Sequence, residues 1–90
     1  KAKMLYIISD KADGIKKRLL DELHVGVTVL DGHGAYRGDA KNVLLVAVKK
    51  NSYPKMKDVI KEEDPNAFFI VTSATEIYGL NFKKNDKKEL

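Results

Sequence analysis

Three short apolar runs, in which hydrophobic and polar residues do not alternate, constrain the fold of this chain more than any other feature. The runs cover residues 4–8, 43–48 and 68–71. A strand with one face in water alternates apolar and polar side chains, whereas a strand that is apolar throughout favours burial on both faces. The sequence therefore predicts strands that are buried on both faces, each face packed against another layer.

Two amphipathic segments between these runs predict helices. Asp10 or Asp13 is expected to cap the first helix, which runs to about His24, and Asn51 or Ser52 is expected to cap the second. The apolar stripe of the first helix is Ile15, Leu19, Leu20 and Leu23, and that of the second is Tyr53, Met56, Val59 and Ile60. The second helix should stop at Asp64, because the residue before a proline leaves helical space.

The expected order of elements is strand, helix, strand, strand, helix, strand. Its strands are residues 4–9, 27–30, 43–48 and 67–72, and residues 75–78 extend the last strand or form a short fifth one. This order is the split βαβ pattern of an α+β, ferredoxin-like βαββαβ two-layer sandwich. Right-handed crossovers would place both helices on one face of the sheet. Residues 1–82 are expected to form one domain, with residues 83–90 as a basic, frayed tail.

Two helices can cover only one face of a four-stranded sheet, so the second face would remain apolar and uncovered. Such a patch exceeds the few hundred Å² usual for monomers, and we predict that it packs against another copy or another domain. The alternative is ordinary exposure of apolar side chains at the sheet edges. The residues assigned to this interface are Leu44, Val46, Val48, Phe69 and Val71.

A glycine-rich stretch, residues 26–38, begins as the second predicted strand and continues as the loop that leads to the third. Glycines let backbone amides approach a ligand closely, so one interpretation is a site for a small anionic ligand or nucleotide. Arg37 and Lys41 would then supply charge and Tyr36 a stacking face. The other interpretation is a hairpin turn, since Asp-Gly is common turn chemistry. The candidate ligand-binding residues are Asp31, Gly32, His33, Gly34, Tyr36, Arg37, Gly38 and Lys41.

The sequence gives little support to metal or catalytic chemistry. Asp31, His33 and Asp39, with His24 as a distant fourth, match no standard spacing of metal ligands. No serine or threonine has an activating base evident in the sequence. We therefore predict no enzyme activity, no metal site and no cofactor.

Composition narrows the partners further. The net charge of +4 and a pI near 9.3 would permit nucleic acid or acidic membrane. Much of the excess charge lies in residues 83–88 without interleaved aromatic side chains, so a nucleic-acid partner is not expected. The chain has no cysteine, which rules out disulfides, and no apolar run approaches the roughly 20 residues of a membrane span. It begins Lys-Ala-Lys with no initiator Met and no signal peptide, so we expect a piece of a longer protein.

The glycine-rich stretch, together with residues near the second helix end, resembles a known family signature. That family is a domain of unknown function at the C-terminal, cytoplasmic end of YitT-family bacterial membrane proteins. The first half of the resemblance is Gly26-Val27-Thr28, Asp31-Gly32-x-Gly34-Ala35-Tyr36-x-Gly38 and Lys41. The second half is Asp64-Pro65-x-Ala67-Phe68, Glu76 and Gly79-x-x-Phe82. The chain departs from the family at Arg37, where Thr is frequent, and at Asn81, where Gly is frequent.

The resemblance implies a PII-like version of the ferredoxin-like fold. PII-type proteins are typically trimers, bind nucleotides or other small ligands between subunits, and use the loop between strands two and three as an effector arm. It therefore implies a homo-oligomer, with a trimer favoured, on the cytoplasmic face of the bacterial membrane. It also adds Glu76 to the candidate ligand-binding residues.

The leading hypothesis is a non-catalytic, regulatory, ligand-sensing domain of a bacterial membrane protein. It would bind a small anionic ligand or nucleotide near residues 31–41. The alternative is a purely structural domain that oligomerises the membrane protein.

Overall fold

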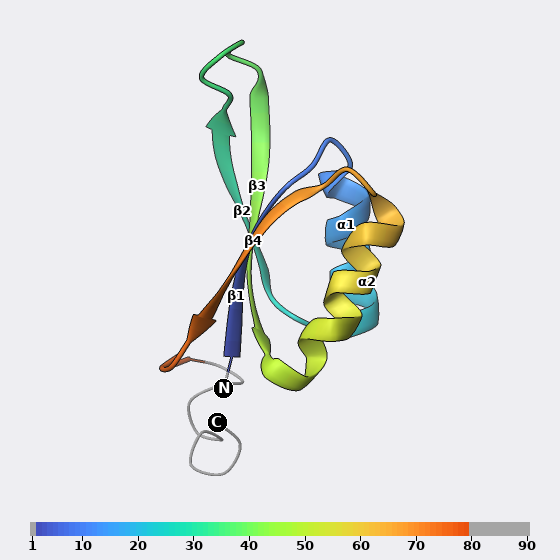
Figure 1. The fold of residues 1–90 in the computed structure, drawn as a ribbon, viewed down its shortest axis with the longest axis vertical. Helices are drawn as coiled ribbons and strands as arrows, with labels where there is room; N and C mark the ends of the chain where they lie inside the picture. The colour runs from blue at the N-terminus through green and yellow to red at the C-terminus, as the bar shows by residue number, and fades with distance from the viewer. Residues whose placement is uncertain (1, 80–90) are drawn as a thin grey trace.

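The computed structural model describes residues 2–79 (Figure 1). The tail expected for residues 83–90 lies outside the described residues. In chain order the elements are β1 (Ala2–Ile8), α1 (Ala12–Arg18), the π-helical turn η1 (Leu19–Leu23), β2 (Val27–His33), β3 (Ala40–Lys49), the short 3₁₀ helix η2 (Lys50–Ser52), α2 (Tyr53–Glu63) and β4 (Phe68–Ala74). The predicted order of strands and helices is confirmed.

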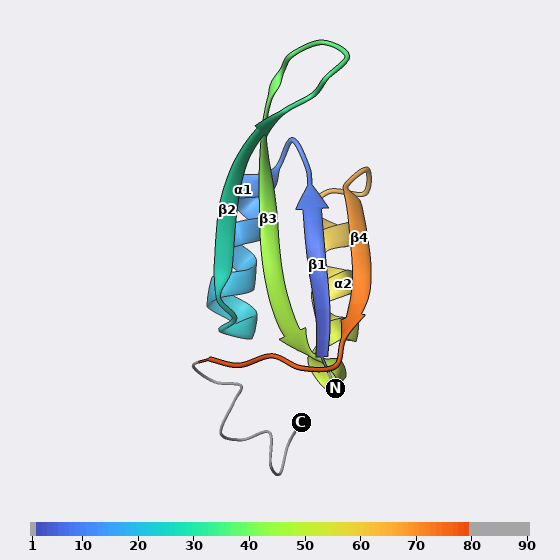
Figure 2. The ribbon, with the colours of Figure 1, turned by 90° about the vertical axis from the view of Figure 1, so that its left-hand side faces the viewer.

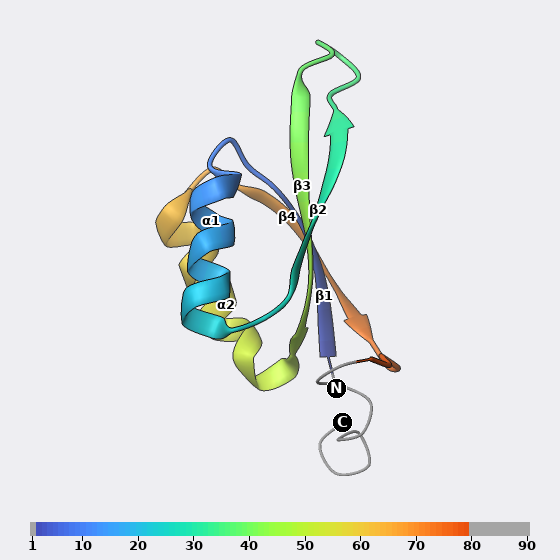
Figure 3. The same ribbon diagram turned by 180° about the vertical axis from the view of Figure 1, so that it is seen from behind.

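The four strands form one antiparallel sheet in the order β2-β3-β1-β4. Both helices lie on one side of this sheet, and the other side carries no helix (Figures 1 and 3). We call that other side the open face; it is turned toward the viewer in Figure 2. The predicted ferredoxin-like two-layer sandwich is therefore confirmed.

The core lies between the sheet and the helices. The central strand β1 contributes Leu5 and Ile7, which are fully buried. Alternation along a strand sends every second side chain to the same face, so the register partners of these two residues face the helices with them. The helices contribute Ala12, Ile15, Leu19, Met56, Val59 and Ile60.

The predicted interface residues belong to this core, so that assignment is wrong. Leu44 pairs with Ile7 and Val46 with Leu5, and the side chains of Leu44, Val46 and Val48 are each 1% exposed beneath the helices. Phe69 and Val71, the β4 partners of Ile7 and Leu5, are half-buried against the same core. The open face is instead formed by the alternate residues of each strand, Met4, Tyr6, Ile8, Leu30, Val43, Leu45, Ala47, Phe68 and Ile70.

Local signals set the ends of the helices, although not always those expected. Neither Asp10 nor Asp13 caps α1, whose N-cap position is Lys11; the Ser9 hydroxyl accepts a hydrogen bond from the Lys11 amide at 2.8 Å. His24 ends the helical segment in the left-handed conformation, with φ of 54°. The helix α2 stops at an extended Asp64, as the following proline predicts.

The strands β2 and β3 are longer than predicted and shorten the loop between them. Pairing continues through Asp31 with Asn42, Gly32 with Lys41 and His33 with Ala40. The strand β1 ends at Ile8, opposite Val43, so the ribbon beyond that point has only two strands. It projects past the rest of the sheet (Figures 1 and 2).

The strand β4 runs two residues further than predicted, to Ala74. Residues 75–79, the last that the structure describes, add no fifth strand. They turn and cross the end of the open face that is remote from the projecting ribbon (Figure 2).

Candidate functional site

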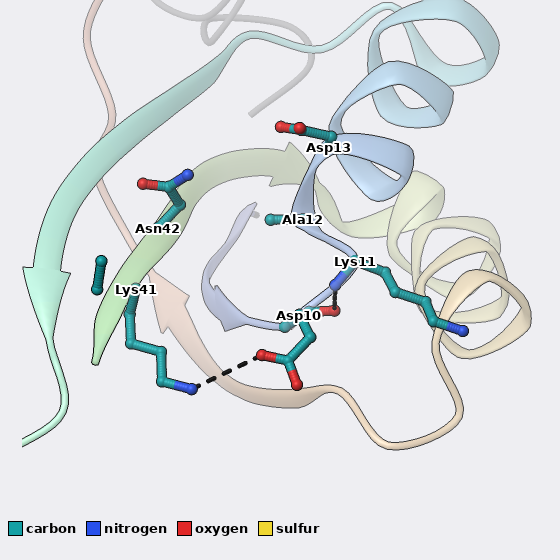
Figure 4. Close-up of a pocket in the computed structure, with 8 residues that line it drawn as sticks. Asp10, Lys11, Ala12, Asp13, Lys41 and Asn42 are labelled. Carbon is teal, nitrogen blue, oxygen red and sulfur yellow. Dashed lines mark hydrogen bonds and ion pairs between the residues drawn. The ribbon is translucent and has the colours of Figure 1, made fainter. Parts of the chain in front are cut away.

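A cleft opens at the base of the projecting ribbon, where three connections meet. Its walls come from the β1–α1 connection at residues 9–11, from Lys41 near the start of β3, and from the α2–β4 connection at residues 64–66. This part has a volume of about 310 Å³. A second lobe of about 230 Å³ reaches toward Asp13 and Asn42 (Figure 4).

A hydrogen bond between the side chains of Ser9 and Asp64 joins two of these walls. The Ser9 hydroxyl donates to Asp64 Oδ2 at 2.5 Å, and the Asn66 amide donates to Asp64 Oδ1 at 2.9 Å. The residue Asp64 is buried, with 7% exposure. The Ser9 hydrogen bond, followed by that from the Asn66 amide, holds the pKa of Asp64 below its usual range. These two hydrogen bonds satisfy the buried carboxylate of Asp64 and hold two walls of the cleft together.

Lys41 is the cation at the mouth of the cleft. Its Nζ lies 3.7 Å from Asp10 Oδ1, and the Asp10 side chain is 92% exposed. The two side chains point toward each other, whereas the Lys11 side chain extends away from them (Figure 4). An exposed ion pair at this distance is weak, so the Lys41 ammonium can exchange Asp10 for another anion.

The structure does not bring the predicted ligand-binding residues together. Lys41 lines the cleft, but His33 lies in the projecting ribbon, and Tyr36 and Arg37 belong to the turn at its tip, where Tyr36 is 96% exposed. Glu76 follows β4 at the other end of the sheet from the ribbon. Within one chain, the predicted site residues therefore lie in three separate places: Lys41 at the base of the ribbon, the turn residues at its tip, and Glu76 at the opposite end of the sheet.

The turn at the tip uses two of the glycine amides that a ligand would need. The Gly34 amide donates to the Asp39 carbonyl at 2.8 Å, and the Gly38 amide donates to the Gly34 carbonyl at 2.7 Å. Gly38 has φ of 78°, which disfavours any residue with a side chain. Turn geometry therefore accounts for Gly38, and the turn's hydrogen bonds already occupy the amides of both glycines. Among residues 2–79, no three His, Cys, Asp or Glu side chains are grouped to hold a metal ion.

Sequence reasoning missed most of the cleft. It treated Asp64 only as a helix stop and Ser9 only as a strand end. The signal for Asp64 was nevertheless present in Asp64-Pro65-Asn66, because an aspartate commonly accepts a hydrogen bond from the amide two residues later. Its partner Ser9 is distant in the chain, and no local pattern joins the two.

The open face presents a second surface with functional potential. Its large apolar side chains include Tyr6 at 38% exposure, Leu30 at 39%, Ile70 at 47% and Phe68 at 60%. They occupy two neighbouring rows, because Tyr6 pairs with Ile70, while Ile8 pairs with both Val43 and Phe68. Both rows lie at the end of the sheet near the cleft.

Residues 25–79 match the DUF2179 family, described as an uncharacterized protein conserved in bacteria. The UPF0750 membrane protein YpjC of Bacillus subtilis strain 168 is 39% identical over 87 residues, which are 97% of this chain and 30% of that protein. Over 79 residues, or 88% of this chain, the UPF0750 membrane protein YitT of the same strain is 28% identical, and the match covers 28% of YitT. The chain thus spans about 30% of the length of these membrane proteins.

Solved structures agree with the fold. A crystal structure of a DUF2179 protein from Eubacterium ventriosum is 39% identical, with a TM-score of 0.70, over 80% of this chain and 99% of that one. The periplasmic divalent cation tolerance protein CutA from Archaeoglobus fulgidus shares the fold, with a TM-score of 0.63 at 14% identity over 87% of this chain and 88% of that one. No helix within residues 2–79 is long and apolar enough to cross a membrane.

Proposed function

The chain belongs to the DUF2179 family of bacterial domains, and on that premise we propose that it is a non-catalytic, ligand-sensing module of a membrane protein. Its relatives YpjC and YitT are membrane proteins of which it matches about 30%. In this proposal the module lies on the cytoplasmic side and takes a small anionic ligand in the cleft at the base of the β2–β3 ribbon. The proposed site is therefore the base of the glycine-rich hairpin, not its tip.

The observation that carries this proposal is the position of Lys41. Its ammonium stands at the mouth of a cleft of about 310 Å³, paired at 3.7 Å with an aspartate that is almost wholly in water. That volume is at the lower end for small-molecule sites. A carboxylate or phosphate group could accept a shorter, charge-assisted hydrogen bond from Lys41 than Asp10 does now.

The same residue connects the cleft to the ribbon. Lys41 pairs with Gly32 inside the ribbon, and Asp10 belongs to the β1–α1 connection. A ligand that takes Lys41 from Asp10 would break the contact between these two parts of the chain. If the ribbon has two arrangements and the ligand binds one of them better, binding shifts their populations, which is how the module would report the ligand.

A thermal-shift experiment tests the site with three probes: inorganic phosphate, ATP and citrate, each against potassium chloride of equal ionic strength. A probe at ten times its Kd adds about 1.4 kcal/mol to the free energy of unfolding, or about 6–11 °C in Tm for a domain of this size. Lys41→Gln should abolish the shift. Arg37→Gln at the tip, which removes the same charge, should leave it intact. The proposal fails if no probe exceeds the salt control, or if Lys41→Gln keeps the full shift.

A second candidate function is self-assembly, and the exposed apolar rows of the open face favour it. Phe68 and Ile70 are 60% and 47% exposed on a face without a helix layer. Packing these rows against other copies would remove them from water, and the module would then hold several membrane proteins together, with or without a ligand. A homo-oligomer is the proposed state, and a trimer is the arrangement that the resemblance to PII-type proteins implies.

Sedimentation velocity across micromolar concentrations would count the copies. Ile70→Glu should shift the population to monomers, because an assembled face would bury the new carboxylate. Asn51→Glu adds the same charge at an exposed position on η2 and should leave assembly unchanged. A monomer at all concentrations would remove this candidate without affecting the ligand proposal.

A further inference from the structure

The edge of β3 that faces β1 is uncovered where the projecting ribbon begins. The last residue of β1, Ile8, lies opposite Val43, whereas β3 starts three residues earlier, at Ala40. Within residues 2–79, the sheet has no strand beside residues 40–42 on that edge. Figure 2 shows β1 ending while β3 continues beside β2. The backbone along an uncovered strand edge is a template for pairing with another strand.

Hydrogen bonds of the ribbon show which backbone groups point to this edge. The Gly34 amide donates to the Asp39 carbonyl at 2.8 Å, and these two residues lie one step beyond the last pair of the β2–β3 register. In an antiparallel pair, opposite residues that exchange hydrogen bonds alternate with opposite residues that do not. Ala40 and Asn42 therefore direct their amides and carbonyls away from β2, toward the uncovered edge. Both residues are exposed.

Asp10 marks the place that a carboxylate on an added strand would take. Because Ile8 is opposite Val43, residue 10 on the continued line of β1 would be opposite Lys41. The chain instead leaves that line after Ile8 and bends toward the helices (Figure 1). The Asp10 side chain nevertheless reaches back, and its Oδ1 lies 3.7 Å from Lys41 Nζ. Opposite side chains on neighbouring antiparallel strands lie close enough for such pairs.

The cleft provides room beside this edge. Its lobe of about 230 Å³ lies between residues 9–13 and residues 40–42 (Figure 4). The Asp10 side chain is 92% exposed, so replacing its carboxylate on Lys41 by another costs little. A ligand that brings both a backbone and a carboxylate would use the strand edge and the cation together.

We infer that the cleft binds an extended, acidic peptide segment of another protein, which adds to β3 as an antiparallel strand beside residues 40–42 and places an aspartate or glutamate opposite Lys41. Main-chain hydrogen bonds to Ala40 and Asn42 supply affinity, and the carboxylate on Lys41 supplies selectivity. The inference rests on the proposed anion site at Lys41, and it gives the ligand of that site a chemical class.

Two capped pentapeptides test the carboxylate: acetyl-Thr-Val-Glu-Val-Thr-amide and the same peptide with Gln in place of Glu. Shifts of the Ala40 and Asn42 amides in ¹H–¹⁵N correlation spectra of the labelled protein measure binding. The Glu peptide should bind about tenfold more tightly, because its carboxylate accepts a hydrogen bond from Lys41. Lys41→Gln should bind the two peptides equally, whereas Arg37→Gln should keep the preference. Equal binding of the two peptides to the wild type would overturn the inference.

N-methylation of the Glu peptide tests the strand pairing on the wild-type protein, so it decides the case even if Lys41→Gln does not fold. The Glu amide, opposite Lys41, points away from β3, and its methylation should change the Kd by no more than about twofold. The amide of the next valine, opposite Ala40, points at β3, and its methylation should weaken binding about tenfold. Equal effects at the two positions would overturn the inference.

Further controls separate this inference from the proposed function. A response to phosphate or citrate, with none to either peptide, would overturn the inference and leave the proposed function standing. No response to any of these probes would remove both. If the Ala40 and Asn42 amides shift with protein concentration in the absence of peptide, a second copy occupies the edge, and the inference is overturned.

Discussion

Phe68 and Phe69 provide a matched test of which face of the sheet is covered. They are neighbours in β4 with the same side chain, but Phe68 is 60% exposed on the open face, whereas Phe69 packs against the core beneath the helices. Replacing a fully buried phenylalanine with alanine costs about 3–5 kcal/mol. For Phe69, which is mostly covered, we expect a loss of about 3 kcal/mol, or about 12–24 °C in Tm. For Phe68 we expect about 1 kcal/mol, because water already reaches most of the ring and no closed cavity forms.

Urea denaturation followed by far-UV circular dichroism would measure both variants. The protein concentration should be low enough to keep the chain monomeric, since a partner copy on Phe68 would add a concentration-dependent contribution. A parallel pair on β3 gives the same contrast through charge: Val46→Glu should prevent folding, because it places a carboxylate in the core, whereas Leu45→Glu should remain folded. Equal losses from the two phenylalanine variants, or a folded Val46→Glu, would refute the assignment of faces.

Three further predictions concern charge and backbone. His24→Gly should raise the free energy of unfolding by about 1 kcal/mol in denaturant titrations, because glycine relieves the left-handed conformation; His24→Ala should give no comparable gain. The lowered pKa of Asp64 contributes stability above about pH 4 that is lost as the pH falls through the folded-state value; melting curves of Asp64→Asn should therefore show a lower Tm at pH 7 and a weaker fall in acid than wild type. Arg18→Met should lower Tm at low salt and have less effect in 1 M NaCl, because Arg18 bridges α1 to Glu62 and Glu63 of α2 through partly exposed ion pairs that salt screens; a drop of equal size at both salt concentrations would contradict a screened role.

The order of elements could be predicted from the sequence, but the two sides of the strands could not. The apolar stripes that include Ile15 and Met56 indicated which side of each helix packs on the core. The proline after Asp64 indicated where the second helix ends. In β3, residues 43–48 are all apolar, so both alternate sets looked equally suited to the core. Only the crossover of the chain decides which set lies under the helices.

A weak signal for the faces was present in the flanking residues. The odd-numbered set of β3 runs from Lys41 through Ala47 to Lys49, and the corresponding residues of the neighbouring strands include Tyr6 and Thr72. The opposite set, which faces the helices, also carries polar residues, namely Lys3, Asn42 and Ser73. Polar residues therefore flank both sets, and this signal is too weak to assign the faces.

The candidate site was predicted only in part for a different reason. Lys41 was selected as part of a loop, but strand pairing through His33 and Ala40 removes it from the loop and places it at the base of the ribbon. The other walls of the cleft come from Ser9 and Asp64, which are 55 positions apart in the chain. A site formed by segments so far apart depends on topology, which motif matching does not supply.

The position of β1 also has a consequence for the folding pathway. This strand precedes the others in the chain, yet it lies inside the sheet, and Ile8 pairs with both Val43 and Phe68. Until β4 has been synthesised, one edge of β1 has no strand to pair with. The apolar run of β1 then resembles an aggregation-prone edge strand. Such distant pairing favours folding in milliseconds to seconds over microseconds. A ribosome-bound chain that ends before residue 68 should therefore be the species that most needs a chaperone.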